Sequence, residues 1–219
     1  MVRTNSKEEI MEIYLINGKN NIGKTDFAVN LAERLSEDKR VLLTSFFRSE
    51  KSNIEDYYKK DGMVSYDISD YFLGVCELER VMVRENANLS FIIAPLLDDK
   101  YEFRVDDVYR LIDELDYDVL IIDNLDLAIK DAIKIEIVDK DDLDKDIHAD
   151  YYFINRMDDN FDPRVIKDKL LGKSAKYLGF VKENEYFKKI IDNLLKGEAE
   201  PIADIGFFEK IKRIFKKWK

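Results

Sequence analysis

Short apolar runs, separated by segments with helical spacing, constrain the fold of this chain more than any other feature of its sequence. Four runs are almost continuously apolar: residues 12–16 (EIYLI), 41–44 (VLLT), 89–94 (LSFIIA) and 117–123 (YDVLIID). Continuous apolar character is typical of strands that are covered on both faces, as in parallel sheets. Residues 151–155 and 177–181 can supply two further strands.

Two segments between these runs have the spacing of amphipathic helices. From Lys24 onward, large apolar residues recur at intervals of four, at Phe27, Leu31 and Leu35. Residues 104–116 place apolar side chains on one helical face, at Val105, Val108, Leu111, Ile112 and Leu115. The alternation of strands and helices predicts an α/β fold, a doubly wound, mostly parallel sheet with helices on both faces.

Length and composition agree with one globular domain. The 219 residues suffice for one large core, and 46% of them are hydrophobic. With 8 glycines and 3 prolines, the chain is poor in the residues that a loop-rich all-β protein needs. It has no internal repeat and no linker rich in proline, glycine or serine. We therefore expect one domain, residues 1–205, followed by a tail, residues 206–219.

Composition also limits the compartment and the partners. The single cysteine, Cys76, excludes an internal disulfide framework, and we expect it to be a small buried residue in a reducing compartment. We find no secretory signal and no run of about 18 apolar residues, which favours a cytoplasmic protein without a membrane-spanning helix. The formal net charge of −10 argues against general affinity for nucleic acids.

The stretch INGKNNIGKT, residues 16–25, contains the pattern of a phosphate loop. Gly18, Gly23, Lys24 and Thr25 match G-x-x-x-x-G-K-[ST], with a predicted strand before the pattern and a predicted helix after it. That context matters because backbone N–H groups and a helix N-terminus together create an anion site. We expect the nucleotide to bind at Gly18, Asn20, Asn21, Ile22, Gly23, Lys24, Thr25 and Asp26.

Each polar residue of the loop has an expected role. Lys24 can place its ammonium between the terminal phosphates, and the Thr25 hydroxyl can coordinate Mg²⁺. Asn20 and Asn21 stand where such loops often have glycine. Asparagine tolerates positive φ angles better than other non-glycine residues, so the loop can keep its shape.

Asp123 is the second expected component of the site. It ends the apolar run DVLIID and should emerge at the carboxyl end of a buried strand, where ligands of open α/β sheets bind. A carboxylate there can hold Mg²⁺, or its bound water, opposite the Thr25 hydroxyl. Thr25 and Asp123 are therefore the predicted metal residues.

Residues 137–150 (IVDKDDLDKDIHAD) are dominated by acidic side chains. Such a cluster can bind a divalent cation, but the spacing lacks the glycine and the terminal glutamate of a calcium loop. We interpret the segment as a solvated acidic loop. His148, the only histidine, has no cluster of further ligands, and we assign it no role.

The tail GFFEKIKRIFKKWK is amphipathic when wound as a helix. Its apolar side consists of Phe207, Phe208, Ile211, Ile214, Phe215 and Trp218. Basic residues flank or oppose that side: Lys210, Lys212, Arg213, Lys216, Lys217 and Lys219. A helix lying in a membrane interface explains both halves, with aromatic residues among lipids and lysines near anionic headgroups. A helix docked on the core and a helix binding nucleic acid or a partner are the alternatives.

These motifs resemble those of the MinD/ParA group of deviant phosphate-loop ATPases, most closely the MinD-like proteins. GKNNIGKT is similar to the family's G-K-G-G-x-G-K-T loop, with Lys19 at the signature lysine. YDVLIID is similar to the strand that carries the magnesium-associated aspartate. YYFINR resembles the strand whose asparagine contacts adenine, here Asn155 followed by Arg156. The tail is similar to a membrane-targeting helix of MinD.

The resemblance implies an ATP-dependent homodimer with ATP and Mg²⁺ between the subunits. Lys19 would reach the phosphates of the partner subunit and act as the catalytic residue. Membrane binding would follow the ATP state, on the inner face of the cell membrane. The protein would position an unidentified protein partner, in cell division or another form of spatial organisation.

The sequence departs from the family pattern in three places. Ser45, Phe46 and Phe47 stand where the family has an Asp-x-Asp, one aspartate of which helps to position the attacking water. An aromatic side chain cannot orient water as a carboxylate does. Asp26 replaces a threonine, and Lys182 replaces a proline near the last strand. We therefore expect weak hydrolysis at most. A catalytically inactive membrane adaptor and a ParA-like protein that partitions DNA are the alternatives.

Overall fold

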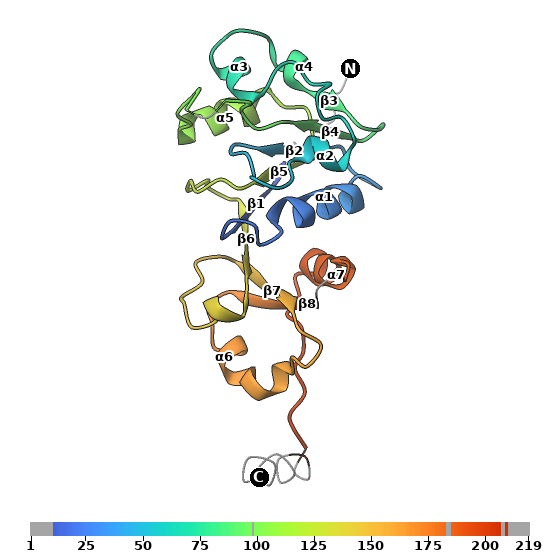
Figure 1. Ribbon diagram of the computed structural model, residues 1–219, viewed down its shortest axis with the longest axis vertical. Coiled ribbons are helices and arrows are strands. Elements are labelled where there is room, and N and C mark those ends of the chain that lie inside the picture. The colour runs from blue at the N-terminus through green and yellow to red at the C-terminus, as the bar shows by residue number, and fades with distance from the viewer. Residues whose placement is uncertain (1–10, 98, 183–184, 207–208, 210–219) are drawn as a thin grey trace, which may run out of the picture. The chain divides into compact units, whose positions relative to one another are not determined.

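The computed structural model describes residues 11–97, 99–182, 185–206 and 209 (Figure 1). The chain forms two compact units, Met1–Ile137 and Val138–Lys219. Among the described residues, no helix combines the length and the apolar character needed to cross a bilayer. The apolar and basic residues of the predicted membrane helix all lie outside the described residues, namely Phe207, Phe208, Lys210, Ile211, Lys212, Arg213, Ile214, Phe215, Lys216, Lys217, Trp218 and Lys219.

The first unit is built on a mostly parallel sheet in the order β3-β4-β2-β5-β1-β6. Strands β1, β2, β4, β5 and β6 are parallel, and β3 pairs with β4 in the antiparallel sense. Their bounds are β1 Glu12–Gly18, β2 Val41–Ser45, β3 Val83–Arg84, β4 Leu89–Ile92, β5 Val119–Asp123 and β6 Ile133–Val138. All five residues of β2 and of β5 are buried, as their continuous apolar sequences predict.

Helices cover the two faces of this sheet (Figure 1). One face is covered by α3 Ile68–Phe72, α4 Leu78–Val81 and α5 Val105–Glu114, which share a hydrophobic core with the sheet residues Leu15, Leu42, Leu120 and Ile122. The other face carries α1 Lys24–Leu35 and α2 Ile54–Tyr57. Tyr58, directly after α2, stacks on Phe91 of β4 with ring centroids 5.1 Å apart.

The second unit contains a parallel pair of strands, β7 Tyr151–Met157 and β8 Lys176–Lys182. It also contains the short 3-10 helices η1 Lys140–Asp142 and η2 Pro163–Ile166 and the helices α6 Lys167–Leu171 and α7 Lys188–Lys196. Tyr152, Ile154, Leu170 and Tyr177 form the centre of its hydrophobic core. Helix α7 packs on β8 through Ile190, Ile191 and Leu194.

The predicted α/β class is confirmed, and each of the six predicted strands is present within a few residues of its expected bounds. The interpretation of residues 137–150 as a loop is wrong at its start, because Ile137 and Val138 end strand β6. In β6, Lys134 and Glu136 alternate with isoleucines, of which Ile135 and Ile137 are buried, so the segment lacks the continuous apolar run used to find the other strands. Farther along, Asp139 caps η1 by accepting hydrogen bonds from the backbone N–H groups of Asp141 and Asp142, at 3.0 and 3.2 Å.

Candidate nucleotide site

The turn between β1 and α1 has the backbone of a phosphate loop. Gly18 has a φ of 147°, and a Cβ atom there would lie 2.5 Å from the backbone oxygen of Ile137. Gly23 has a φ of 97° and directly precedes α1. Asn21 has a φ of 61°, the left-handed conformation that asparagine accepts more easily than most residues. One of the two asparagines therefore takes over the conformational role of a glycine.

Lys24 lies inside this loop. Its side-chain amine donates hydrogen bonds to the backbone oxygens of Gly18 and Lys19, at 2.8 and 2.9 Å. The residue is 7% exposed, and burial lowers the pKa of its ammonium, while the charge of Asp123 acts in the opposite direction. Because the loop folds around it, the ammonium is positioned to meet an anion that enters the loop.

Thr25 and Asp123, which are 98 residues apart in the sequence, are in direct contact. The Thr25 hydroxyl Oγ1 donates a hydrogen bond to Asp123 Oδ2 at 2.6 Å. Asp123 is 2% exposed, and its other carboxylate oxygen, Oδ1, has no hydrogen-bond partner within the described part of the chain. Burial raises the pKa of Asp123 to about 6, although the Thr25 hydroxyl and the Lys24 ammonium both act to lower it.

These groups fit a magnesium ion. Mg²⁺ binds oxygen ligands, and in nucleotide sites it takes one or two from the protein and the others from phosphates and water. Thr25 and Asp123 supply one hydroxyl and one carboxylate at the same point. A buried carboxylate oxygen without a partner is costly unless a cation or a water satisfies it. A cation bound at this point would supply the partner that Asp123 Oδ1 lacks.

The sheet register explains why these residues meet. In the parallel ladders, Asp123 of β5 is aligned with Ile16 of β1 on one side and with Ser45 of β2 on the other. The carboxyl ends of the three central strands therefore lie at one edge, where the loop begins two residues after Ile16. Asn124 follows with a φ of 62° and donates its backbone N–H to Ile16 at 3.0 Å, which ties the ends of β5 and β1 together.

The end of β2 presents no carboxylate to this edge. Ser45 is buried and donates its hydroxyl to the backbone oxygen of Phe47 at 2.9 Å. Phe46 is 1% exposed and packs edge-on against Phe103, with ring centroids 4.8 Å apart. Phe47 is 53% exposed. Of the three residues that stand in place of the expected acidic motif, Ser45 and Phe46 are thus buried and Phe47 lies at the surface.

Asp26 lies in the first turn of α1, where the helix dipole favours an acidic side chain. The side-chain amide of Asn30 donates to the backbone oxygen of Asp26 at 2.8 Å and to its carboxylate Oδ1 at 3.4 Å. The carboxylate thus has a contact along the helix, one turn beyond the loop.

The remaining predicted residues are placed in different ways. Lys19 and Asn20 are exposed in the loop, and Ile22 is 1% exposed in the core beneath it. In the second unit, Asn155 is 7% exposed in β7, and its side-chain oxygen Oδ1 accepts a hydrogen bond from the backbone N–H of Arg156 at 2.9 Å. Arg156 is exposed and has a φ of 59°. These two residues adjoin each other at an irregularity in the pairing of β7 with β8.

Sequence reasoning missed the segment that follows β2. Arg48 forms an ion pair with Glu55 of α2, with 2.6 Å between Nη2 and Oε1, and Glu55 is 3% exposed. Two residues farther, Tyr57 ends α2. No motif marks either feature, because α2 has only four residues and contains no long apolar stripe.

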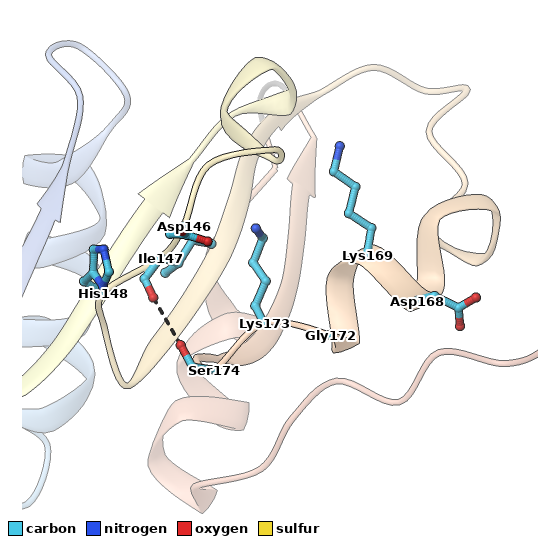
Figure 2. A pocket seen from close by; sticks show the side chains of 8 residues that line it. All are labelled: Asp146, Ile147, His148, Asp168, Lys169, Gly172, Lys173 and Ser174. Carbon is cyan, nitrogen blue, oxygen red and sulfur yellow. Dashed lines mark hydrogen bonds between the residues drawn. The ribbon is translucent and has the colours of Figure 1, made fainter.

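The second unit has a shallow pocket of about 450 Å³ between the segment after η1 and the end of α6 (Figure 2). Its polar side chains already hold that segment in place. Lys173 donates to the backbone oxygen of Lys145 at 2.6 Å, and Ser174 donates to that of Ile147 at 3.4 Å. Lys169 forms an ion pair with Asp144 at 2.5 Å. His148 lines the same pocket, and we assign no ligand to it.

Comparison with known proteins finds relatives of the fold among solved structures only. No protein-family model matches the chain, and no curated protein sequence matches it. Solved structures do match. A plasmid partition protein from Borrelia burgdorferi is 19% identical with a TM-score of 0.66, over 85% of this chain and 99% of that chain. MinD in the MinC:MinD cell division complex of Aquifex aeolicus is 19% identical with a TM-score of 0.65, over 89% of this chain and 100% of that chain.

A third structure adds a ligand to the comparison. The septum site-determining protein MinD of Pyrococcus horikoshii, complexed with Mg-ADP, is 17% identical with a TM-score of 0.61, over 87% of this chain and 87% of that chain. Similarity at this level of identity establishes the fold. The chain has the MinD/ParA-like fold of phosphate-loop ATPases, as the resemblance of its loop and strands predicts.

Proposed function

We propose that the chain is a nucleotide-binding protein that takes ATP with Mg²⁺ at the loop between β1 and α1. The single observation that supports this most is the contact between Thr25 and Asp123 beside the enclosed Lys24 ammonium. In this proposal the loop from Gly18 to Asp26 surrounds the phosphates, and Thr25 and Asp123 hold the cation. The Mg-ADP in the Pyrococcus horikoshii structure supports the choice of ligand.

Each residue of the loop contributes a defined property. Gly18, Asn21 and Gly23 give the backbone the positive φ angles that let N–H groups converge on phosphate oxygens. Lys24 supplies a positive charge in a partly desolvated place, where its attraction for phosphate is less screened than in water. When bound, Mg²⁺ would neutralise phosphate charge beside the Thr25 hydroxyl and the Asp123 carboxylate.

Titration calorimetry with ATP and Mg²⁺ tests the site. We expect the unmodified protein to bind, and both Lys24→Ala and Asp123→Asn to weaken binding more than tenfold. Lys130→Ala is the matched control, because Lys130 belongs to the same unit and its side chain is 82% exposed. Absence of binding by the unmodified protein, or equal binding by Lys24→Ala, would refute the proposal.

We further propose that nucleotide binding promotes a homodimer in which Lys19 reaches the phosphates of the partner subunit. The exposure of Lys19 on the loop is compatible with this role. Its test is analytical ultracentrifugation with and without ATP, comparing the unmodified protein with Lys19→Ala. If both dimerise to the same extent and turn over ATP at the same rate, Lys19 does not act in this way.

Membrane docking through residues 206–219 is the third part of the proposal. The separation of aromatic and basic residues in that sequence supports it, and the helix would bring the protein to the inner face of the cell membrane reversibly. Sedimentation with vesicles that contain anionic lipid should pellet the full chain and leave a chain ending at residue 205 in solution. Vesicles of neutral lipid serve as the control. Equal pelleting of both chains would contradict this role.

A non-catalytic adaptor of the same fold is the alternative, and the end of β2 specifically favours it. Ser45, Phe46 and Phe47 provide no carboxylate to orient an attacking water. Such an adaptor would bind nucleotide and dock an unidentified protein partner to the membrane. The MinC:MinD complex shows that a protein of this fold assembles with a partner. ATP turnover that Lys24→Ala abolishes would exclude the adaptor.

A further inference from the structure

The tail contains one acidic residue, and that residue is bound to the second unit. Residues 206–219 carry six basic side chains and a single carboxylate, Glu209. Arg164 of η2 holds this carboxylate with two hydrogen bonds, from Nη1 to Oε2 at 3.0 Å and from Nη2 to Oε1 at 2.8 Å. A pair with two parallel bonds has a defined geometry and is stronger than a single hydrogen bond. The one acid of a basic segment therefore has a specific partner outside the tail.

A second carboxylate fixes the direction of the Arg164 guanidinium. Asp162 accepts hydrogen bonds from Nε at 2.9 Å and from Nη2 at 2.8 Å, and it also accepts the backbone N–H of Arg164 at 3.1 Å. Asp162 thus occupies one edge of the planar guanidinium, and the edge formed by Nη1 and Nη2 is presented to Glu209. Because Asp162 and Arg164 are close neighbours in one turn, this orientation does not depend on Glu209.

The segment before the tail is tied to the same part of the second unit. Ile202 is 8% exposed and belongs to the hydrophobic core of this unit. Lys167, at the start of α6, forms an ion pair of 2.8 Å with Asp204. The chain from Ile202 to Glu209 is therefore held beside η2 and the start of α6 at the point where the tail begins.

The surface next to Glu209 has the same chemistry as the tail. Arg164 and Lys167 are cationic, with side chains that are 34% and 27% exposed, and Val165 between them is 58% exposed. The guanidinium edge that holds the Glu209 carboxylate also fits a lipid phosphate, since both anions offer two oxygens to two parallel N–H groups. An anionic bilayer would repel Glu209 and attract Arg164.

We propose that Arg164 is a binding residue for the phosphate group of anionic lipids, and that Glu209 occupies its binding edge while the protein is in solution. This inference rests on the proposed membrane docking of residues 206–219 and adds to it a residue from outside the tail. At the bilayer, Arg164 exchanges the Glu209 carboxylate for a lipid phosphate, while Asp162 keeps the guanidinium in place. Glu209 therefore lowers the affinity of the protein for an anionic membrane.

The test compares the unmodified full chain with Glu209→Gln, with Glu198→Gln, and with Glu209→Gln combined with Arg164→Lys. Glu198→Gln is the matched control, because it makes the same change of charge at another exposed position of the same unit. Arg164→Lys keeps the charge but cannot form two parallel bonds with one anion. Sedimentation with vesicles of equal parts phosphatidylglycerol and phosphatidylcholine measures the affinity. Vesicles of phosphatidylcholine alone give the background, and urea unfolding checks that each variant is folded.

We expect Glu209→Gln to bind the anionic vesicles about tenfold more tightly than the unmodified protein, because a repelled charge is removed and the guanidinium edge is opened. Glu198→Gln should change the affinity less than about twofold, since the field of the bilayer is screened within a Debye length. Adding Arg164→Lys to Glu209→Gln should weaken binding again by about threefold, although the net charge stays the same.

Two results would overturn the inference while leaving membrane docking intact. One is binding by Glu209→Gln that is no tighter than binding by Glu198→Gln. The other is equal binding by Glu209→Gln with and without Arg164→Lys, since charge alone would then account for the gain. If neither the unmodified protein nor Glu209→Gln sediments with the anionic vesicles, the proposed docking itself fails, and this inference fails with it.

Discussion

The buried carboxylate of Asp123 predicts an unusual dependence of stability on pH. Its pKa is raised from 3.8 to about 6, mainly because the group is 2% exposed. Between these two values the folded protein keeps a proton that the unfolded chain has released. Stability without ligand therefore falls as the pH rises through this window, and the loss is complete above the folded pKa.

The size of the effect follows from the shift. A difference of roughly two pKa units corresponds to about 3 kcal/mol, since one unit is worth about 1.4 kcal/mol. Asp123→Asn removes the titration and keeps an oxygen that can accept the Thr25 hydroxyl. The cost of burying the new amide does not change with pH, so it cancels when one compares the same pair of proteins at two pH values.

The assay is urea unfolding of both proteins without nucleotide at pH 4 and at pH 8. Relative to the unmodified protein, we expect Asp123→Asn to gain about 2 kcal/mol of unfolding free energy between these pH values, less than the full effect because pH 4 lies just above the unfolded pKa of 3.8. Adding ATP with Mg²⁺ at pH 8 should stabilise the unmodified protein and leave the variant nearly unaffected. A difference between the two proteins that stays constant with pH would refute the reasoning, because Asp123 would then be solvated or paired in the folded state.

Three further predictions concern the loop, the end of β2 and an ion cluster. Gly18→Ala should destabilise the fold by about 2 kcal/mol or more and abolish nucleotide binding. The reason is that Gly18 has a φ of 147° and that a Cβ atom there would lie 2.5 Å from the backbone oxygen of Ile137. Differential scanning calorimetry measures the loss of stability, and titration calorimetry measures the loss of binding. Phe46→Ala should cost about 3–5 kcal/mol in urea unfolding, whereas Phe47→Ala, at a side chain that is 53% exposed, should cost less than about 1 kcal/mol; similar values for both would contradict the assigned burial. Asp67, which is 0% exposed, accepts hydrogen bonds from the Leu96 N–H and the Lys100 amine at 2.8 and 3.0 Å. Burial acts to raise the pKa of Asp67, but these bonds and the Ser69 hydroxyl lower it overall, so its contribution to stability is present above the unfolded pKa of 3.8 and is lost as the pH falls through the lower folded value. Asp67→Asn should therefore be less stable than the unmodified protein at pH 7, with a smaller difference in urea unfolding at pH 3.

Several elements could be predicted because their signals are local. The apolar runs VLLT and YDVLIID predict buried strands, and every residue of β2 and of β5 is indeed buried. The loop from Gly18 to Thr25 is a contiguous pattern, and the conformation of Asn21 follows from the tolerance of asparagine for positive φ. Strand β6 and helix α2 escaped prediction, because one alternates charged and apolar residues and the other has only four residues.

The sequence by itself determined the α/β class and the phosphate loop, and it marked Asp123 as a residue at a strand end. Only the tertiary structure decided the strand order that aligns Asp123 with Ile16 and Ser45, and the burial that leaves Asp123 Oδ1 unpaired. The physical reason is that backbone propensity and hydrophobic pattern act over a few neighbouring residues, whereas desolvation and strand register arise from contacts between residues that lie far apart in the chain.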